Sequence, residues 1–182
     1  MRRLITSLIA CLLLAACAGR MPKPLVELPT LRLSPASLPA PLALQQQLQF
    51  RFGSHERELD ALLEADAQQL QLAVQAMGRT GVRLRWDGEH LQQERAPWLP
   101  PQVRAERVLD DLQFALWPTA AIAAALPSGW SVLDDGVRRQ LRQGDTTWLE
   151  LQRSADGTLL LDNRAEGYSL QIHSIDMQVQ QP

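Results

Sequence analysis

Cysteine is nearly absent from this chain of 182 residues, which contains only two. Cys11 and Cys17 both lie in an amino-terminal segment where Arg2 and Arg3 precede an apolar run from Leu4 to Leu14. A basic start, a short apolar run and small residues before a cleavage site are typical of a secretory signal. Cleavage before Cys17 would leave one cysteine and exclude an intrachain disulfide, so core packing alone must hold the exported domain together.

The sequence also lacks an apolar run long enough to span a bilayer. A span takes about 20 residues, and the stretch from Leu4 to Leu14 is shorter. It ends in Leu14-Ala15-Ala16-Cys17, which resembles the lipobox of bacterial lipoproteins, where the cysteine is diacylated. We therefore predict a lipoprotein signal peptide over residues 1–16 and lipid attachment at Cys17. An ordinary signal, or a membrane anchor with an incidental cysteine, is the alternative. An Asp after the lipidated cysteine retains lipoproteins in the inner membrane of enterobacteria. Ala18 stands there instead, which favours the outer membrane and its periplasmic face.

Motifs for catalysis and metal binding are missing as well. His55, His90 and His173 fall on different predicted elements, without the spacing of zinc ligands. There is no nucleophile elbow and no glycine-rich phosphate loop. The acidic residues between positions 58 and 66 could bind a cation, but a solvated outer face explains them more simply. We therefore expect no enzyme activity, no cofactor and no metal site.

A basic excess is absent too. The chain has 18 Lys and Arg against 20 Asp and Glu, and removal of the signal takes away two Arg and no acid. Nucleic acid is therefore not an expected partner. Six of the twelve prolines fall between residues 18 and 43, which predicts an extended, semi-rigid tether over residues 17–43. The folded domain is expected over residues 44–182.

From residue 44 onward, apolar and polar residues alternate. The alternation continues to about residue 94, with turns predicted at 53–54, 78–81 and 87–88, and it resumes from 130 to 179. Such alternation is typical of antiparallel strands with one apolar and one wet face. We expect about ten strands. A change of alternation at His173-Ser174 predicts a bulge in the last strand.

Between the two runs of strands, the apolar spacing becomes helical. The segment 103–117 carries apolar residues on one side and Arg104, Arg107, Asp110 and Asp111 on the other, and Trp117-Pro118 ends it. A second short helix is expected from an N-cap at Thr119 to Leu126. The first helix would either cover an apolar cavity as a lid or fill the barrel as core, and the periodicity leaves both open.

Several segments resemble a family of uncharacterised proteobacterial lipoproteins, known as a domain of unknown function and often encoded beside aryl polyene pathways. They are Arg83–Gly88, Val108–Gln113, Leu116–Pro118 and Gly167–Ile172. The layout is similar to that of LolB, the outer-membrane lipoprotein receptor, and of its soluble relative LolA. This resemblance implies a mainly β (α+β) fold: an incomplete, strongly curved antiparallel barrel, with a helical lid inserted after about the fifth strand over a cavity for acyl chains.

One departure from LolB concerns the loop between two early strands. LolB-like receptors carry a longer loop there with an exposed apolar residue, whereas the nearest turn here, Gly78–Gly81, is short and polar. This difference argues against a direct lipid-inserting step.

The resemblance implies an outer-membrane lipoprotein that binds an acyl or polyene-type lipid, or lipoprotein acyl chains, and aids their localisation, with a LolA-like periplasmic carrier as partner. The alternative is a structural or docking lipoprotein with a filled barrel that binds a periplasmic partner. The expected lining of the cavity includes three of the five tryptophans and consists of Phe50, Leu72, Trp86, Leu112, Leu116, Trp117, Ile122, Trp130, Tyr168 and Leu170.

Overall fold

One antiparallel sheet of ten strands dominates the computed structural model, which describes residues 26–99 and 103–177. Two helices and a short 3-10 helix complete the described part of the chain. The elements are η2 (Pro35–Ser37), β1 (Leu42–Phe52), β2 (His55–Ala65), β3 (Leu70–Ala76), β4 (Arg79–Trp86), β5 (Leu91–Arg95), α2 (Ala105–Leu116), α3 (Thr119–Ala125), β6 (Trp130–Asp134), β7 (Arg138–Gln143), β8 (Thr146–Arg153), β9 (Leu159–Asn163) and β10 (Tyr168–Asp176). The prediction of ten strands with helices after the fifth is confirmed for the described residues.

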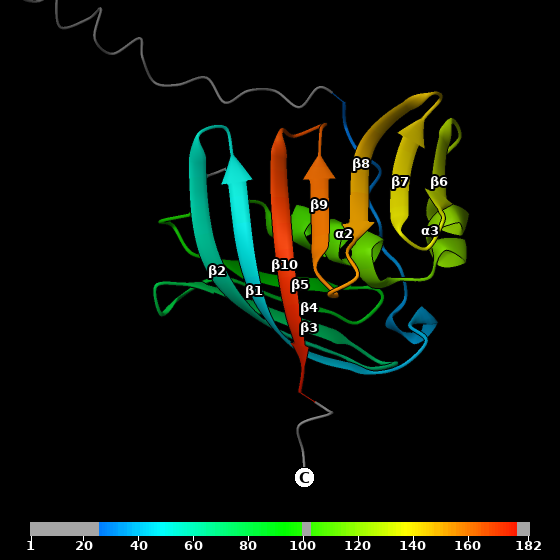
Figure 1. Cartoon of the computed structure of the whole chain (residues 1–182). Coiled ribbons are helices and arrows are strands. Elements are labelled where there is room, and N and C mark those ends of the chain that lie inside the picture. Colours follow the sequence, from blue (N-terminus) through cyan, green and yellow to red (C-terminus); the bar gives the residue numbers. More distant parts are fainter. Residues whose placement is uncertain (1–25, 100–102, 178–182) are drawn as a thin grey trace, which may run out of the picture.

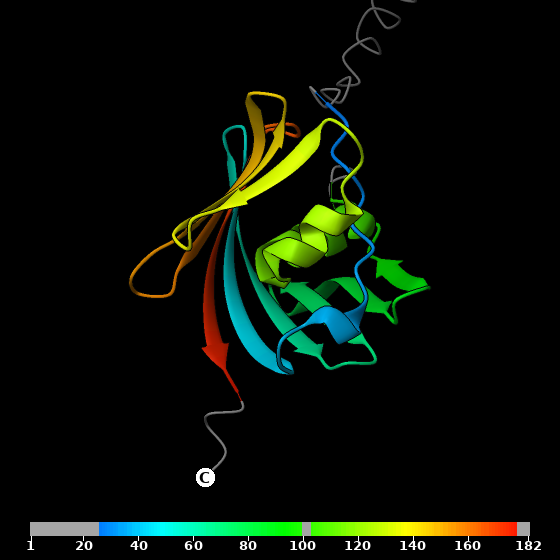
Figure 2. The same ribbon diagram turned by 90° about the vertical axis from the view of Figure 1, so that its right-hand side faces the viewer.

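The sheet consists of two meanders joined through one strand pair. Its order is β5-β4-β3-β2-β1-β10-β9-β8-β7-β6, so β1 and β10 lie in the middle and β5 and β6 form the two edges. The sheet bends strongly and does not close, and α2 lies inside its concave side (Figures 1 and 2). The curvature thus leaves one side of the molecule without a strand.

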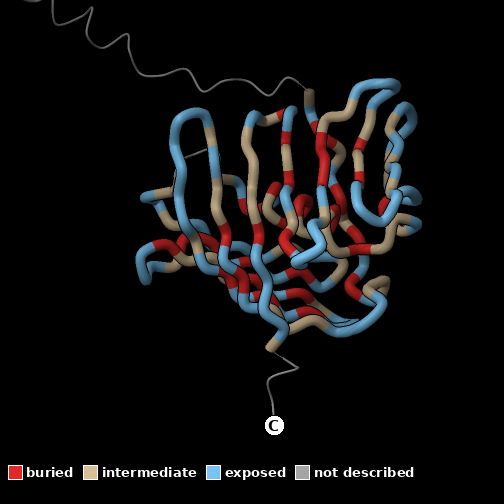
Figure 3. The backbone as a smooth tube through the Cα atoms, in the orientation of Figure 1, coloured by how far each residue is buried: buried red, intermediate tan, exposed pale blue. Residues whose placement is uncertain are grey.

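The alternation predicted from the sequence places the core on the concave face. Leu63, Leu72, Leu84, Leu151 and Leu161 all point inward and are at most 5% exposed. Cross-strand partners confirm the shared face, since Leu63 pairs with Leu72, and Leu151 with Leu161. Figure 3 shows the buried positions alternating with exposed ones along the strands. The convex face carries the polar residues and meets solvent.

Two local predictions were wrong. The turn between β3 and β4 consists of Met77 and Gly78 alone, with φ of 48° and 71°, as a two-residue type I′ hairpin requires. The sheet also continues in register through His173, which pairs with Gln47. The register shifts lie instead after Val74 and after Leu141. The change of apolar pattern near His173 reflects exposure of the strand end, not a bulge.

The amino-terminal part of the described chain is not the tether that its prolines predict. Residues 26–38, here called the strap, cross α2 on the side that the sheet leaves open (Figure 2). Leu28, Leu31 and Leu33 are buried to 6% exposure or less and belong to the hydrophobic core. The predicted domain boundary at residue 44 is therefore wrong, because the fold includes at least residues 26–43. Residues 17–25 lie outside the described part.

Hydrogen bonds from buried side chains hold the backbone of the strap. Gln113 of α2 accepts from the N–H of Leu33 and donates to its carbonyl oxygen, at 3.2 and 3.0 Å. The indole N–H of Trp86 donates to the same carbonyl at 2.8 Å, and that of Trp117 donates to the Ser34 carbonyl at 3.0 Å. The strap therefore replaces the missing strands without joining the sheet.

A buried arginine fixes the carboxyl end of α2. The Arg139 guanidinium of β7 donates to the carbonyl oxygens of Phe114 and Trp117 and to Asp134 Oδ2. Its positive charge stabilises carbonyls that have no partner within the helix. Partial burial disfavours ionisation of Asp134, but hydrogen bonds from Arg139 and other donors lower its pKa. The hydrogen bonds from Arg139 to the carbonyls therefore join α2 to the β6–β7 hairpin, and the ion pair with Asp134 holds Arg139 in place.

We predict that the strap contributes to stability. Leu31→Ala should lower the free energy of unfolding by about 2–5 kcal/mol, because Leu31 is 2% exposed and its truncation leaves a cavity. Leu62→Ala is the matched control, since Leu62 is 45% exposed on the convex face and should change stability by less than about 0.5 kcal/mol. Urea unfolding measures both. Equal midpoints for the parent and Leu31→Ala would show that the strap is not part of the cooperative fold.

Candidate functional site

The helix α2 is enclosed on every side. None of its residues after Glu106 is exposed. Asp110 and Gln113 face the strap, because both accept hydrogen bonds from its backbone. Asp111 faces β10, because the Tyr168 hydroxyl donates to Asp111 Oδ2. The sheet and the strap therefore hold opposite sides of the same helix.

The apolar packing between α2 and the middle of the sheet is incomplete. Val108 and Ala115 lie one turn before and after Asp111, on the helix side that faces β10, and both are only half-buried. On the sheet, Leu59 of β2 and Leu170 of β10 point to the same side and are half-buried too. We call these four residues, with Leu112, the seam. Apolar side chains from both layers are only half-buried there.

The predicted cavity-lining residues do not surround one hollow. Trp86 and Trp117 are fully packed and bind the strap, while Leu72 and Ile122 are buried in the core. Trp130 is half-buried on β6, remote in the strand order from β1 and β10. The rest are half-buried in or near the seam: Phe50, Leu112, Leu116, Tyr168 and Leu170. Half of the predicted set thus gathers around the contact of α2 with the mid-sheet.

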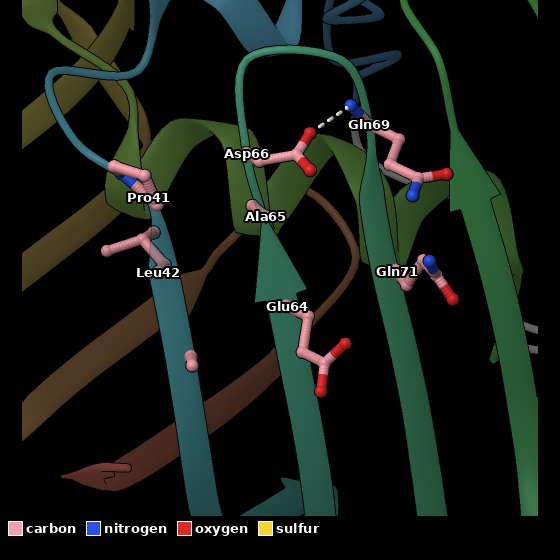
Figure 4. Close-up of a pocket in the computed structure, with 8 residues that line it drawn as sticks. Pro41, Leu42, Glu64, Ala65, Asp66, Gln69 and Gln71 are labelled. Atoms are coloured by element: carbon pink, nitrogen blue, oxygen red, sulfur yellow. Dashed lines mark hydrogen bonds between the residues drawn. The ribbon is translucent and has the colours of Figure 1, made fainter. Parts of the chain in front are cut away.

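Two hollows in the described part of the molecule lie away from the seam, and polar and apolar residues line both. One opens beside the β2–β3 turn, where Glu64, Asp66, Gln69 and Gln71 line it with Pro41 (Figure 4). The other lies on the convex face beside His173 and the glutamines of β1. Asp66 orders its turn by accepting from the Gln69 N–H at 2.9 Å. Neither of these two hollows is lined by a residue of the seam.

A charged cluster occupies the side of α2 that was predicted to face solvent. Asp110 and Asp111 are 4% and 8% exposed, and Arg107 is buried between Asp110 and Glu166, at 3.4 and 3.0 Å. The placement of Asp110 and Asp111 outside was therefore wrong. The reason is that the strap and the β9–β10 turn cover this side and supply partners for the charges.

The two aspartates differ in how fully they are paired. Asp110 accepts from the Leu31 N–H at 2.9 Å and pairs with Arg32 and Arg107. Asp111 accepts from Tyr168 alone, and its Oδ1 atom is buried without a hydrogen-bond partner among the described residues. Burial raises the pKa of Asp111 to about 7, although Arg107 and Tyr168 oppose this shift. Asp111 is therefore the least satisfied charged group of the cluster.

Comparison with protein families identifies the family to which the chain belongs. A family model described as a protein of unknown function (DUF3261) matches residues 43–176. The chain belongs to this family. The match begins at β1 and ends with β10, so the DUF3261 domain comprises the whole sheet and both helices, and the strap precedes it. No curated protein matches the chain.

The described part of the chain offers no obvious alternative chemistry. Among residues 26–99 and 103–177, no three His, Cys, Asp or Glu side chains are grouped so that they could hold a metal ion. In the same ranges, no helix has the length and apolarity needed to cross a bilayer. We take the seam with its adjoining Asp111 and Tyr168 as the candidate site, because half-buried apolar side chains border a buried carboxyl group there.

Sequence reasoning missed the pair formed by Asp111 and Tyr168. The two residues are 57 positions apart, and only the return of β10 to the middle of the sheet brings them together. One signal was available, since Tyr168 begins the inward-facing set of β10 that continues with Leu170 and Ile172. An inward hydroxyl requires a buried partner. Helical periodicity could not name that partner, because it treats acidic residues as exposed.

We predict that Asp111 makes the domain less stable as the pH rises from 5 to 8. The folded state holds the Asp111 proton up to about pH 7, whereas the unfolded chain releases it near 3.8. The folded state therefore binds more protons in this range, and stability falls with pH, by at most about 1.4 kcal/mol per unit for one group. Urea midpoints measured from pH 5 to 8 give the slope.

Asp111→Asn should flatten this slope, because the amide does not titrate. Asp60→Asn, an exposed change on the convex face, is the control and should keep the parental slope. A parental stability that stays constant or rises between pH 5 and 8 would contradict the assignment.

Proposed function

We propose that the DUF3261 domain binds the apolar chain of a lipid at the seam, as part of an outer-membrane lipoprotein anchored through Cys17. One observation carries the proposal: half-buried apolar residues of α2 face half-buried apolar residues of the mid-sheet, in an open, curved sheet. An apolar chain placed there would complete the burial of Val108, Leu112, Ala115, Leu59 and Leu170. Their remaining exposure costs free energy that a ligand can recover.

The magnitudes are sufficient for useful affinity. Burial of an apolar chain gives about 0.8 kcal/mol per CH₂, so ten methylenes give about 8 kcal/mol before the costs of association. Micromolar binding requires about the same total. Because the seam is not a preformed cavity, α2 must shift to admit the chain, and this cost lowers affinity relative to an open pocket. We therefore propose α2 as a lid that moves on binding.

The layout of the sheet supports kinship with lipoprotein-localisation proteins. An unclosed antiparallel sheet with helices on its concave side is the architecture that the resemblance to LolA and LolB implied. By this analogy the ligand is an acyl or polyene-type lipid, and a LolA-like periplasmic carrier is the proposed partner. Localisation and lipid attachment remain proposals from the signal sequence, because Cys17 lies outside the described residues.

A docking lipoprotein is the second candidate, and the filled half of the interior favours it. Phe114, Trp117, Leu109 and Gln113 are completely buried. In that version the barrel is a rigid support, and the convex face, where Leu62 and Ile175 are 45% and 52% exposed on either side of Gln45, binds a periplasmic partner. Ligand binding separates the two candidates.

We predict that the full chain, held in an amphipathic polymer, binds a fluorescent fatty acid at one saturable site that an unlabelled fatty acid competes for. The dissociation constant should be on the order of micromolar. Ala115→Trp should weaken binding at least about tenfold, since an indole at the seam fills the space that the chain needs. Ala123→Trp, at an exposed position of α3, is the matched control and should bind as the parent does. Absence of parental binding, or equal binding by Ala115→Trp, would favour docking.

Lipid attachment is tested separately. Cys17→Ser should block acylation and leave the precursor uncleaved, because the sulfur is the site of attachment. Fractionation of the expressing bacteria and the apparent mass of the chain measure this. If the serine variant is processed and still sediments with the outer membrane, the lipoprotein assignment is wrong.

A further inference from the structure

A buried carboxyl group with one unused oxygen lies beside the seam. Asp111 is 8% exposed, its Oδ2 accepts from the Tyr168 hydroxyl, and its Oδ1 has no hydrogen-bond partner in the described residues. The neighbouring Arg107 pairs with Asp110 and Glu166, although its Nε, like Asp111 Oδ1, lacks a hydrogen-bond partner among the described residues. Leaving a buried acceptor unsatisfied is unfavourable. Asp111 Oδ1 can therefore accept a hydrogen bond from a further donor.

Asp111 lies among the apolar residues of the seam. Asp111 lies between Val108 and Ala115 on the same side of α2, and Tyr168 lies on the inward face of β10, two residues before Leu170. The ring of Phe50 stands 5.5 Å from that of Tyr168. The polar pair is therefore bordered by apolar side chains from both layers. A ligand whose chain follows the seam would bring its polar end to Asp111.

We propose that Asp111 is a head-group subsite, whose free Oδ1 accepts a hydrogen bond from a neutral donor, such as a hydroxyl group, at the end of an apolar chain. This inference rests on the proposed function and names the ligand class of the same site. Three carboxylates and three guanidinium groups make up the surroundings: Asp110, Asp111 and Glu166 with Arg32, Arg104 and Arg107. A neutral donor adds no charge to this balanced set. A head without a donor would leave Oδ1 unpaired.

Two probes of the same chain length test the subsite. 1-Dodecanol offers a hydroxyl donor, whereas dodecyl methyl ether has the same chain and an oxygen without a hydrogen. Each probe should displace the fluorescent fatty acid from the full chain in amphipathic polymer at pH 8. Dodecanol should bind about tenfold to a hundredfold more tightly than the ether, because a hydrogen bond to a charged group accounts for a ratio of that size.

The double variant Asp111→Leu/Tyr168→Phe replaces both partners by apolar groups of similar shape. It should bind the ether at least as tightly as the parent does and lose the preference for dodecanol. Asp60→Leu, on the convex face, is the control and should keep that preference. A purely structural role for Asp111 would alter stability but not the ratio of the two affinities. The parental ratio needs no variant, so it remains informative if the double variant does not fold.

A labelling experiment locates the head group independently. A dodecanol with a photoreactive diazirine next to its hydroxyl should label peptides that contain Asp111 or Tyr168. Labelling confined to other peptides, or equal affinity of dodecanol and the ether in the parent, overturns the subsite while chain binding stands. Failure of the fatty acid and of both probes to bind overturns the proposed function, and the subsite with it.

Discussion

The enclosure of one polar helix inside an open sheet is the constraint on which the rest of this fold depends. A curved sheet of ten strands cannot bury α2 alone, because it leaves one side uncovered. The strap covers that side, and its extended backbone brings N–H and carbonyl groups that must also be satisfied. Asp110, Gln113 and the indoles of Trp86 and Trp117 satisfy them. The polar residues of α2 are therefore partners of a backbone that has no strand to pair with.

This arrangement explains which parts of the fold were predictable. Alternation of apolar and polar residues predicts strands, and helical spacing of apolar residues predicts a helix. Both patterns are local in the sequence, so the meanders and the inserted helix could be predicted. The strap and the charged cluster depend on pairs far apart in the chain. Leu31, Leu33 and Pro35 do alternate as an inward-facing segment would. The surrounding prolines were nevertheless interpreted as a tether, because proline content describes local stiffness and not what a segment contacts.

The candidate site was predictable only in part, for a related physical reason. Leu112, Leu170 and Phe50 were named from the apolar sides of their elements, and all three lie in or near the seam. Trp86 and Trp117 were assigned to a cavity because large aromatic side chains often line one. Here the indole N–H groups determine where the two side chains lie, because a buried indole needs a hydrogen-bond acceptor and the carbonyl oxygens of the strap accept from both. Residue type predicted burial correctly, but the hydrogen-bond partner determined which side of α2 each residue covers.

The strap also changes how the proposed lipid anchor relates to the binding site. Nine residue steps separate Cys17 from Val26, the first described residue. A chain extends at most about 3.3–3.6 Å per residue, so this segment reaches no more than about 32 Å. The tether expected from the prolines would have ended at residue 43 and allowed a far greater separation. An anchor at Cys17 would therefore hold the cover of α2 close to the membrane. The strap and the sheet hold opposite sides of α2, and Trp86 of the sheet also donates to the strap. A movement of the helix that opened the seam while the strap stayed in place would therefore strain or break the strap's hydrogen bonds, and under the proposed function this would couple lipid entry to the segment nearest the anchor.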